Sequence, residues 1–386
     1  MTKKRIAFVA NTSWSIYNFR LGLIRQLKSL GYDVILIAPD DNYSAKLITA
    51  GFTFYPINFK KNGISLWDDF RIIRRFHKLY KREKIDFVFH YTIKPIVYGS
   101  FIARLNGIPS ISIMTGLGYL YYCNWFIRFF AFRLLQIASW CYTKIWFLNE
   151  SDRQFFLNNS LVKVAKTDIL PSEGVDALHF KSTESGAQKN STKVRFLYAG
   201  RILWKKGIKE YVEAAKIIKQ DFPAVEFQLL GFVESNNPDS VPIEDIQAWT
   251  KENLIQYLGS VDDVRPYFEA ASCIVLPSYR EGISKTLLEA ASMSKPIIAT
   301  DTPGCREVVK EAYNGFLCQA GDTEDLVKKL GMMIDLPATA RYQMGLNGRK
   351  IVLKKFDESL IVAHYLNTLE AYFQIAKTDA KAKWRK

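Results

Sequence analysis

Short runs of apolar residues alternate with longer amphipathic stretches along most of the chain. Uninterrupted apolar runs are typical of strands buried on both faces, and the stretches between them suit helices that cover those faces. The pattern therefore predicts parallel sheets of the α/β class. The expected strands are Ile6–Ala10, Val34–Ala38, Phe54–Ile57, Phe87–His90, Ser110–Met114, Ile145–Leu148, Val194–Ala199, Phe227–Leu230, Ile255–Leu258, Ile274–Leu276, Ile297–Ala299 and Gly315–Leu317.

A polar segment, KSTESGAQKNSTK at 181–193, divides this pattern into two halves and suits an exposed linker or a long loop. The length of 386 residues also favours two domains. We therefore predict two doubly wound Rossmann-like domains, 1–180 and 194–365, that face one another across a cleft. Residues 366–386 are expected to form a helix and basic tail that pack back on the first domain.

The charge of the chain is unevenly distributed. Residues 1–180 contain 24 Lys and Arg against 12 Asp and Glu, whereas 181–386 contain 29 against 26, within a total net charge of +15. The first half is therefore the candidate for contact with an anionic surface. The five cysteines form no C-x-x-C pair, which fits a reduced cytosolic setting. The apolar run near the start is too short for a signal peptide, and no run suits a spanning helix.

The stretch PSYREGISKTLLEA, 277–290, follows an expected strand and opens an expected helix near Ser284. Free N–H groups and the helix dipole attract an anion to such a helix start. Glu281 lies at this start, and Glu289 lies roughly 7–8 Å further along the axis at about 1.5 Å per residue. Two carboxylates around an anion site suit a nucleotide-diphospho-sugar, which has hydroxyls at both ends. Taken alone, the motif more often contains only a glutamate at a helix start and a solvated glutamate on the helix.

The stretch LYAGRILWKKGIKEYVEAA, 197–215, is the strand, loop and helix that open the second domain. Arg201 and Lys206 project from this loop, where Gly200 and Gly207 allow close backbone approach. Both cations would neutralise the charge on a departing nucleoside diphosphate. By itself, the loop is equally well a solvated basic loop.

Gly200-Arg201 and Lys206-Gly207, followed by EGISKTLLEA and DTPGCREVV, resemble the nucleotide-binding half of glycosyltransferase family 4, retaining enzymes of the GT-B fold. The resemblance implies that Arg201 and Lys206 hold the diphosphate, that Glu289 binds the ribose hydroxyls, and that Glu281 contacts the donor sugar. The other expected donor-binding residues are Gly200, Gly282, Ile283, Ser284, Lys285 and Thr286, with Asn11 and Ser15 from the loop after the first strand.

The same resemblance implies transfer with retention and without a metal or other cofactor, so that the nucleotide sugar, with UDP as its nucleotide, is a substrate. The lack of a D-x-D triplet agrees with this expectation. The sequence departs from the family at several points. Ile283 and Ser284 replace an aromatic residue and a glycine, the first loop has no Gly-Gly pair, and Gly116 stands where a histidine is frequent.

SIYNFR (15–20), TGLGYLY (115–121) and FLNES (147–151) resemble a narrower bacterial set within that family. Its members extend sugars on undecaprenyl pyrophosphate for protein glycans, capsule or O-antigen, and some transfer N-acetylgalactosamine. The resemblance implies a UDP-N-acetylhexosamine donor and a polyprenyl-pyrophosphate-linked saccharide acceptor, with the first domain facing the acceptor and the membrane.

Two segments of the first half favour contact with an anionic membrane surface. RIIRRFHKLYKR predicts a basic amphipathic helix through Arg71, Arg74, Arg75 and Lys78, and residues 119–147 are dense in aromatic side chains with interspersed cations. Solvated basic faces and buried aromatic stripes are the alternatives. With both segments in the basic half, we expect a cytoplasmic protein that is peripheral on the inner face of the cell membrane.

His90 and Lys94, after the fourth expected strand, are candidate contacts for the acceptor, although a histidine at this place is as often structural. Two other functions stay open from the residues alone. A sugar-nucleotide epimerase would need clustered acid–base side chains in the first half, where few follow the strands. A basic binding protein for nucleic acid or membranes would fit the sequence pI of about 9.4, but we expect no nucleic-acid partner because no recognised motif for one is present.

Overall fold

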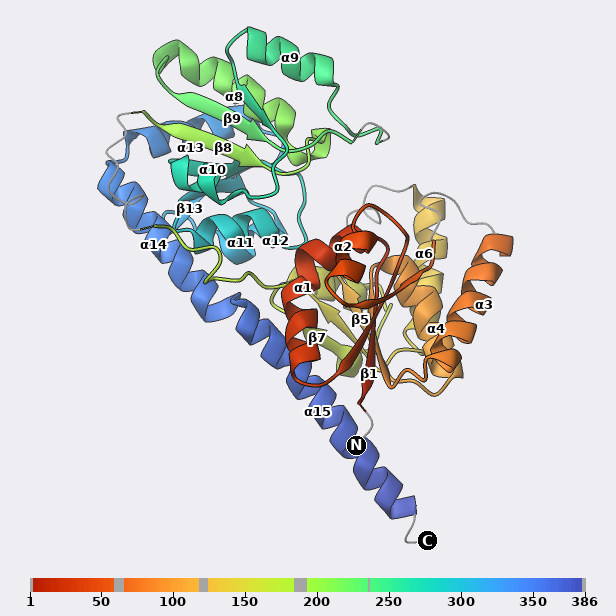
Figure 1. Ribbon diagram of the computed structural model, residues 1–386. Helices are drawn as coiled ribbons and strands as arrows, with labels where there is room; N and C mark the ends of the chain where they lie inside the picture. Colours follow the sequence, from red (N-terminus) through yellow and green to blue (C-terminus); the bar gives the residue numbers. More distant parts are fainter. Residues whose placement is uncertain (1–2, 59–65, 118–123, 184–192, 235–236, 384–386) are drawn as a thin grey trace. The chain divides into compact units, whose positions relative to one another are not determined.

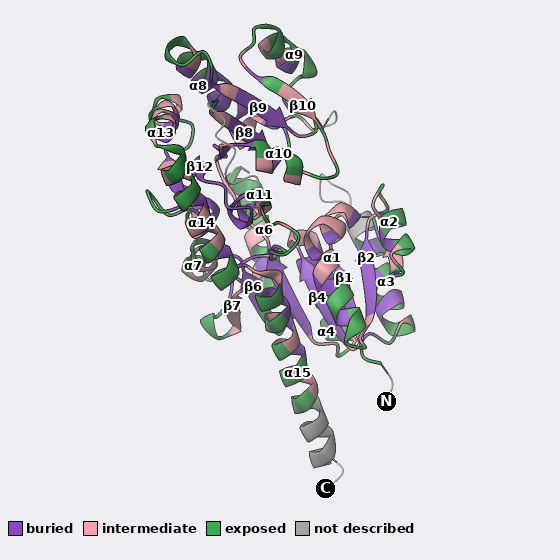
Figure 2. Ribbon diagram, turned by 60° about the vertical axis from the view of Figure 1, so that its left-hand side comes forward, coloured by how far each residue is buried: buried purple, intermediate pink, exposed green. Residues whose placement is uncertain are grey.

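The computed structural model describes residues 3–58, 66–117, 124–183, 193–234 and 237–383, with the backbone alone for 66–69 and 375–383. The chain forms two compact units (Figure 1). One comprises Met1–Glu173 with Glu358–Lys386, and the other comprises Gly174–Asp357. Each unit is built around a parallel sheet whose strands are mostly buried (Figure 2).

The first unit has a sheet of seven strands in the order β3-β2-β1-β4-β5-β6-β7. Its strands are β1 (Arg5–Val9), β2 (Asp33–Ala38), β3 (Thr53–Pro56), β4 (Phe87–Tyr91), β5 (Ser110–Met114), β6 (Lys144–Phe147) and β7 (Thr167–Ile169). Its α-helices are α1 (Ser13–Ser29), α2 (Ser44–Thr49), α3 (Leu66–Arg82), α4 (Ser100–Leu105), α6 (Trp125–Ala138), α7 (Glu150–Asn158) and α15 (Glu358–Lys383). A π-helix, η1 (Pro95–Gly99), and a 3₁₀ turn, η2 (Val164–Lys166), complete it.

The second unit has a sheet of six strands in the order β10-β9-β8-β11-β12-β13. Its strands are β8 (Arg195–Ala199), β9 (Glu226–Leu230), β10 (Gln256–Gly259), β11 (Cys273–Leu276), β12 (Ile297–Thr300) and β13 (Gly315–Cys318). Its helices are η3 (Trp204–Lys206, a 3₁₀ turn), α8 (Ile208–Asp221), α9 (Ile243–Lys251), α10 (Arg265–Ala270), α11 (Lys285–Ser292), α12 (Pro303–Val308), α13 (Thr323–Asp335) and α14 (Ala338–Lys355).

Every strand expected from the sequence is present, with each end displaced by no more than one residue. Long apolar runs are confirmed as strands because a doubly wound sheet buries both of its faces. The prediction missed β7, whose three residues are only partly buried and include a polar pair, Thr167 and Asp168. A short edge strand with polar side chains has no apolar run to reveal it.

The chain passes between the units at Glu173–Gly174 and returns at Asp357–Glu358. Ser182 donates to Glu269 at 2.8 Å, so the polar segment 181–193 begins within the second unit, and its residues 184–192 lie outside the described part. The extents expected from the sequence, 1–180 and 194–365, differ from these bounds by several residues.

Helix α15 packs on the sheet of the first unit. Its Tyr365 is buried and shares a hydrogen bond of 2.7 Å with the hydroxyl of Tyr91 in β4. Further along α15, the ring of Tyr372 meets that of Phe87 edge to face, with ring centroids 5.2 Å apart. Of the helices that the structure describes, none is long and apolar enough to cross a membrane.

Candidate functional site

The predicted donor-binding loops of the second unit lie where the order of its strands reverses. From β8 the chain builds outward through β9 and β10 and then returns to β11, which pairs with β8 in parallel on its other side. The carboxyl ends of β8 and β11 therefore lie side by side and carry Gly200–Lys206 and Pro277–Gly282. In doubly wound sheets, ligands bind beside the carboxyl ends of the strands at this switch point.

Lys206 and Glu281, which the sequence places 75 residues apart, are in contact. The Nζ atom of Lys206 donates to Oε1 of Glu281 at 2.6 Å, and the two side chains are only 20% and 11% exposed. Lys206 ends the 3₁₀ turn η3, and Gly207 follows with a left-handed φ of 75°, which turns the chain into α8. The site thus holds a cation and a carboxylate in one partly desolvated pair, where electrostatic interactions are stronger than in bulk water.

Two glycines bring backbone segments against the loop that carries Glu281. A Cβ atom on Gly207 would overlap the carbonyl oxygen of Pro277, and one on Gly304 would overlap the carbonyl oxygens of Glu281 and Gly282. Any other residue at either position would therefore push the loop away from its neighbours. Gly304 lies in the DTPG stretch that the sequence connects with the family, and the structure gives it this packing role.

Tyr279 also fixes this loop through two hydrogen bonds. Its backbone N–H donates to the carbonyl of Lys205 at 3.0 Å, and its hydroxyl donates to Oε1 of Glu210 at 2.6 Å. Glu210 belongs to the first turn of α8 and is only 5% exposed, and its other oxygen, Oε2, has no hydrogen-bond partner in the structure. The sequence alone does not indicate either residue, because their pairing depends on two segments that meet only in the fold.

Arg201 forms an ion pair with Glu234, separate from the pair of Lys206 and Glu281. Its Nη1 atom lies 3.3 Å from Oε1 of Glu234, and its side chain is 43% exposed. Its backbone carbonyl accepts a hydrogen bond of 2.7 Å from the hydroxyl of buried Tyr198. The loop conformation is therefore fixed from within the core while the guanidinium stays accessible. Glu234, which follows β9, is a further neighbour that the sequence did not indicate.

The expected helix after Glu281 is confirmed as α11. Ser284 is its N-cap, and the Ser284 hydroxyl accepts from the backbone N–H of Leu287 at 3.4 Å. Lys285 and Thr286 follow as the first two helical residues, the positions whose N–H groups have no acceptor within a helix. The side chain of Ile283 packs against the core of the second unit, so this residue can offer a ligand little besides its backbone.

Glu289 lies on α11 and is partly buried. Its Oε1 atom is 3.8 Å from Nζ of Lys285, one turn earlier in the helix. Burial raises the pKa of Glu289 to about 7, although the neighbouring ammonium of Lys285 acts in the opposite direction. This carboxyl group therefore changes its charge near neutral pH.

In the first unit, the carboxylate of Asp41 binds the start of α1. The backbone N–H groups of Ser13 and Trp14 donate to Oδ2 of Asp41 at 3.0 and 3.3 Å, and the Ser13 hydroxyl donates to the same carboxylate. Ser15 uses its N–H and its hydroxyl on Thr12, at 3.2 and 2.9 Å. The N–H and the hydroxyl hydrogen of Ser15 thus have internal acceptors, and the expected donor contact through Ser15 stays a prediction. Asn11, also expected to bind the donor, is exposed beside them.

His90 does not fit the role of an acceptor contact. It is fully buried in β4, with Nε2 at 2.9 Å from the hydroxyl of Tyr80 and Nδ1 at 3.4 Å from that of Ser100. Burial lowers the pKa of His90 to about 3, so the ring is neutral at physiological pH. Its surroundings therefore support a structural role for this histidine.

The remaining candidates of the first unit are at its surface. Lys94 is half-buried and directly precedes η1. Helix α3 buries its apolar face in the core and leaves its basic side chains exposed, as the amphipathic pattern predicts. The exposed basic residues that the sequence singled out are Arg71, Arg74, Arg75 and Lys78. Of the pattern at 115–121, residues 118–121 lie outside the described part of the chain.

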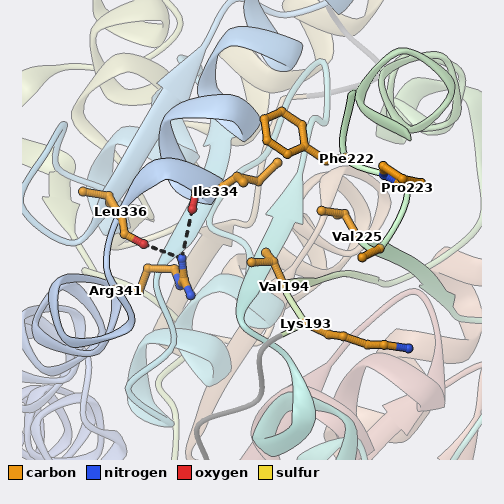
Figure 3. Close-up of a pocket in the computed structure, with 9 residues that line it drawn as sticks. Lys193, Val194, Phe222, Pro223, Val225, Ile334, Leu336 and Arg341 are labelled. Carbon is orange, nitrogen blue, oxygen red and sulfur yellow. Dashed lines mark hydrogen bonds between the residues drawn. The ribbon is translucent and has the colours of Figure 1, made fainter. Parts of the chain in front are cut away.

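A separate cavity of about 350 Å³ opens at the opposite end of the second sheet (Figure 3). It lies beside Val194 and Val225, which precede β8 and β9. There Arg341 donates to the carbonyls of Met333, Ile334 and Leu336, at 3.2, 3.3 and 2.5 Å, where α13 ends. The cavity is therefore distinct from the loops that carry Lys206 and Glu281.

Two family models match the sequence. The model described as glycosyl transferases group 1 matches residues 181–351, and the model described as glycosyl transferase 4-like matches residues 5–139. The chain is 27% identical over 379 residues to the N,N'-diacetylbacillosaminyl-diphospho-undecaprenol alpha-1,3-N-acetylgalactosaminyltransferase of Campylobacter jejuni, which covers 94% of this chain and 97% of that protein. It is 28% identical over 286 residues to the UDP-Gal:alpha-D-GlcNAc-diphosphoundecaprenol alpha-1,3-galactosyltransferase of Escherichia coli, covering 71% and 72%.

Solved structures share the fold at lower sequence identity. HepE of Anabaena in complex with UDP aligns with a TM-score of 0.79 and 18% identity, over 95% of this chain and all of that one. A glycosyltransferase from Rickettsia africae aligns with a TM-score of 0.77 and 19% identity, over 98% of this chain and all of that one. The matches cover both units of the chain. The chain therefore belongs to the group 1 glycosyltransferases of glycosyltransferase family 4, and its fold is GT-B.

Proposed function

We propose that the chain moves a sugar, with retention, from a UDP-sugar to a saccharide on a polyprenyl pyrophosphate during assembly of a bacterial glycan. The observation that carries the proposal is the contact of 2.6 Å between Lys206 and Glu281, beside the start of α11. A cation for phosphate and a carboxylate for sugar hydroxyls then lie on adjacent loops at the strand-order switch, and Glu289 follows on the same helix.

In this proposal each residue has one task. Lys206 and Arg201 bind the diphosphate, and their charge stabilises the leaving UDP as negative charge develops on it. Glu281 accepts a hydrogen bond from a hydroxyl of the donor sugar, and Glu289 accepts from the ribose. The bond between the anomeric carbon and the β-phosphate oxygen breaks while the acceptor oxygen bonds to the same face of that carbon. The acceptor hydroxyl gives its proton to the departing phosphate, so no protein base is required.

The sugar is proposed to be an N-acetylhexosamine, N-acetylgalactosamine being the first choice. The support is the name of the Campylobacter jejuni relative, whereas the Escherichia coli relative is named for galactose. UDP as the nucleotide is supported by the UDP-bound HepE structure. A thermal-shift screen of UDP-sugars separates these choices, since a matched donor stabilises the folded chain by mass action. Independence from metal stays a prediction, to be tested by transfer in EDTA.

The acceptor and its location follow from the same relatives. Both are named for undecaprenyl-diphosphate-linked substrates, which reside in a membrane. We therefore place the chain at the cytoplasmic face of the cell membrane as a peripheral protein. The exposed basic face of α3 supports this placement because cationic side chains are attracted to anionic lipid headgroups. The free thiols of Cys141, Cys273, Cys305 and Cys318 fit a reduced compartment.

Replacing Glu281 tests the proposal. In Glu281→Gln, the side chain keeps its shape and a hydrogen bond to Lys206 but loses its charge. We expect at least about a hundredfold loss of transfer, the scale seen when one stabilising group is removed from an active site. The melting temperature should stay within about 2 °C. The control is Glu307→Gln on α12. It removes the charge of a glutamate that pairs with Lys355 of α14 and should leave transfer unchanged. Wild-type turnover in Glu281→Gln would refute the assignment.

The epimerase alternative finds no support in the residues that the structure describes. Such an enzyme would need acid–base side chains at the strand ends of the first unit, and the histidine found there, His90, is buried and neutral. Incubation with a UDP-sugar and no acceptor would reveal an epimerase, because the epimeric UDP-sugar would accumulate.

A further inference from the structure

Helix α6 exposes an unusual amount of apolar surface. Phe126, Phe130, Leu134 and Ile137 are all exposed, and Trp125 and Trp140, at the two ends of the helical region, are 71% and 72% exposed. Single exposed apolar side chains are common on proteins, but a contiguous set marks a surface that contacts something other than water. Residues 119–123, the first part of the aromatic segment noted in the sequence, lie outside the described residues.

The exposed set forms one stripe along α6. Phe126, Phe130, Leu134 and Ile137 are spaced by four, four and three residues, which places them on one face of a helix. The opposite face anchors the helix, since Leu135 and Ala138 are buried in the core of the first unit. Helix α6 therefore has two apolar faces, and the intramolecular core accounts for only one of them.

The charges around the stripe are of one sign. No Asp or Glu stands between Asp86 and Glu150 in the sequence, and this stretch carries Lys94, Arg104, Arg128, Arg133 and Lys144. Arg128 and Arg133 lie on α6 itself and are exposed. An anionic partner meets no electrostatic repulsion from this stretch.

The basic face of α3 lies on the same side of the sheet as α6. Both helices pack against η1, and Figure 1 shows α3, α4 and α6 together within the first unit. The apolar stripe and the basic helix therefore belong to neighbouring helices of the first unit. An anionic lipid bilayer presents both features, a charged headgroup layer and an apolar interior.

The length of α6 decides how it can meet the bilayer. Its 14 residues give about 21 Å at 1.5 Å per residue, which is shorter than the hydrocarbon core of roughly 30 Å. The helix therefore suits the plane of the interface rather than a spanning orientation. Tryptophans at both of its ends fit this orientation, because their amphipathic rings favour the headgroup level.

We propose that α6 inserts its stripe of Phe126, Phe130, Leu134 and Ile137 into the acyl boundary of an anionic membrane, with Arg133, which flanks the stripe, at the lipid phosphates. The inference rests on the proposed function in one respect, since a lipid-linked acceptor gives the chain a reason to be at a bilayer. The new element is the apolar surface of α6 that enters the membrane. The basic face of α3 attracts the first unit to the membrane, and α6 holds it there.

Vesicle sedimentation tests the proposal with the full chain. The vesicles contain phosphatidylglycerol and phosphatidylethanolamine, and a second set contains phosphatidylcholine alone. We expect the wild type to sediment with the anionic vesicles. The double variant Phe126→Ser, Phe130→Ser should bind them at least about tenfold more weakly. The control is Ile217→Ser, Tyr313→Ser, which removes two exposed apolar side chains of the second unit and should bind as the wild type does.

Two outcomes would overturn the proposal. Equal sedimentation of the wild type and of Phe126→Ser, Phe130→Ser overturns the proposal. A wild-type dimer in light scattering that the double variant abolishes, without any vesicle binding, also overturns it and assigns the stripe to a second copy of the chain. Transfer to a short-chain, water-soluble acceptor should be retained in the double variant, within about twofold. If the wild type itself fails in that assay, the proposed function fails while the sedimentation result still stands.

Discussion

The partly buried carboxyl group of Glu289 leads to a sharp prediction about pH. Burial on α11 raises its pKa to about 7, with the ammonium of Lys285 at 3.8 Å acting against the rise. In its proposed role, Glu289 accepts hydrogen bonds from the ribose hydroxyls, and only the ionised form accepts through both oxygens. The affinity for the donor should therefore increase with pH.

The size of the effect follows from the titration. With a pKa of about 7, roughly a tenth of Glu289 is ionised at pH 6 and roughly nine tenths at pH 8. If the ionised form alone binds, the Kd of the donor falls about tenfold over this interval, or about 1.4 kcal/mol. The donor contributes no slope of its own, because the phosphates of a UDP-sugar are diesters and lack the second ionisation near pH 6 of a terminal phosphate.

The measurement is isothermal titration calorimetry with UDP-N-acetylgalactosamine at pH 6, 7 and 8 and constant ionic strength. Glu289→Gln should bind weakly and show no slope. Lys285→Met should shift the midpoint to higher pH, because the ammonium that lowers the pKa of Glu289 has been removed. A flat wild-type Kd from pH 6 to 8, or a slope that persists in Glu289→Gln, would refute the role of this carboxylate.

The same group affects stability with the opposite sign. The pKa of Glu289 in the folded chain, about 7, exceeds its ordinary value of 4.5, so folding favours the protonated form. The stabilising contribution is complete below about pH 4.5 and is lost as the pH rises through 7, with a span of at most about 3 kcal/mol. Glu289→Gln should therefore unfold at a higher temperature than the wild type at pH 8, while it binds the donor less well.

Two further predictions concern the loop that carries Glu281. Gly304→Ala places a methyl group against the carbonyl oxygens of that loop, so it should lower the free energy of unfolding by about 1–3 kcal/mol and also weaken donor binding. Gly331→Ala on α13, with open space around it, should stabilise the chain slightly. Urea unfolding and calorimetry measure the stability and the donor affinity of each variant, and equal behaviour of the two would contradict the packing role of Gly304. Tyr279→Phe leaves buried Glu210 without its hydrogen-bond donor, so it should lower the free energy of unfolding by about 1–3 kcal/mol and raise the KM for the donor. Tyr313→Phe, at an exposed tyrosine, should change neither quantity. A Tyr279→Phe variant with wild-type stability and KM would exclude a role of Tyr279 in supporting the loop.

The sheets could be predicted from the sequence because doubly wound domains bury both faces of their strands. β11 and β12, for instance, are buried at every position, and all of their residues except Thr300 are apolar. β7 lacks such a run and was missed. The crossing between the units at Glu173–Gly174 could not be predicted from the sequence pattern. The polar segment 181–193 is the stronger indication of a domain boundary, but its described residues belong to the second unit.

For the candidate site, the sequence singled out several charged residues but not the partners that they contact in the structure. Lys206 and Glu281 were each identified from a loop after a strand, and the pairing of β8 with β11 brings them together. Glu210 and Glu234 could not be found in the same way. Each is an ordinary glutamate in its local sequence, and each gains its role only because a residue from another loop lies within hydrogen-bonding distance.

The pairing of Lys206 with Glu281 also bears on which ligands the site favours. The ammonium has three N–H donors and uses one on Glu281 at 2.6 Å, so the others stay available for a diphosphate. A phosphate beside Lys206 brings negative charge toward the carboxylate of Glu281, and this repulsion is relieved when a sugar hydroxyl donates to that carboxylate. With the roles proposed for Lys206 and Glu281, a nucleotide that carries a sugar contacts both side chains favourably, whereas the nucleotide alone leaves Glu281 facing the phosphate. The glycines that hold the two loops together fix the separation on which this discrimination depends.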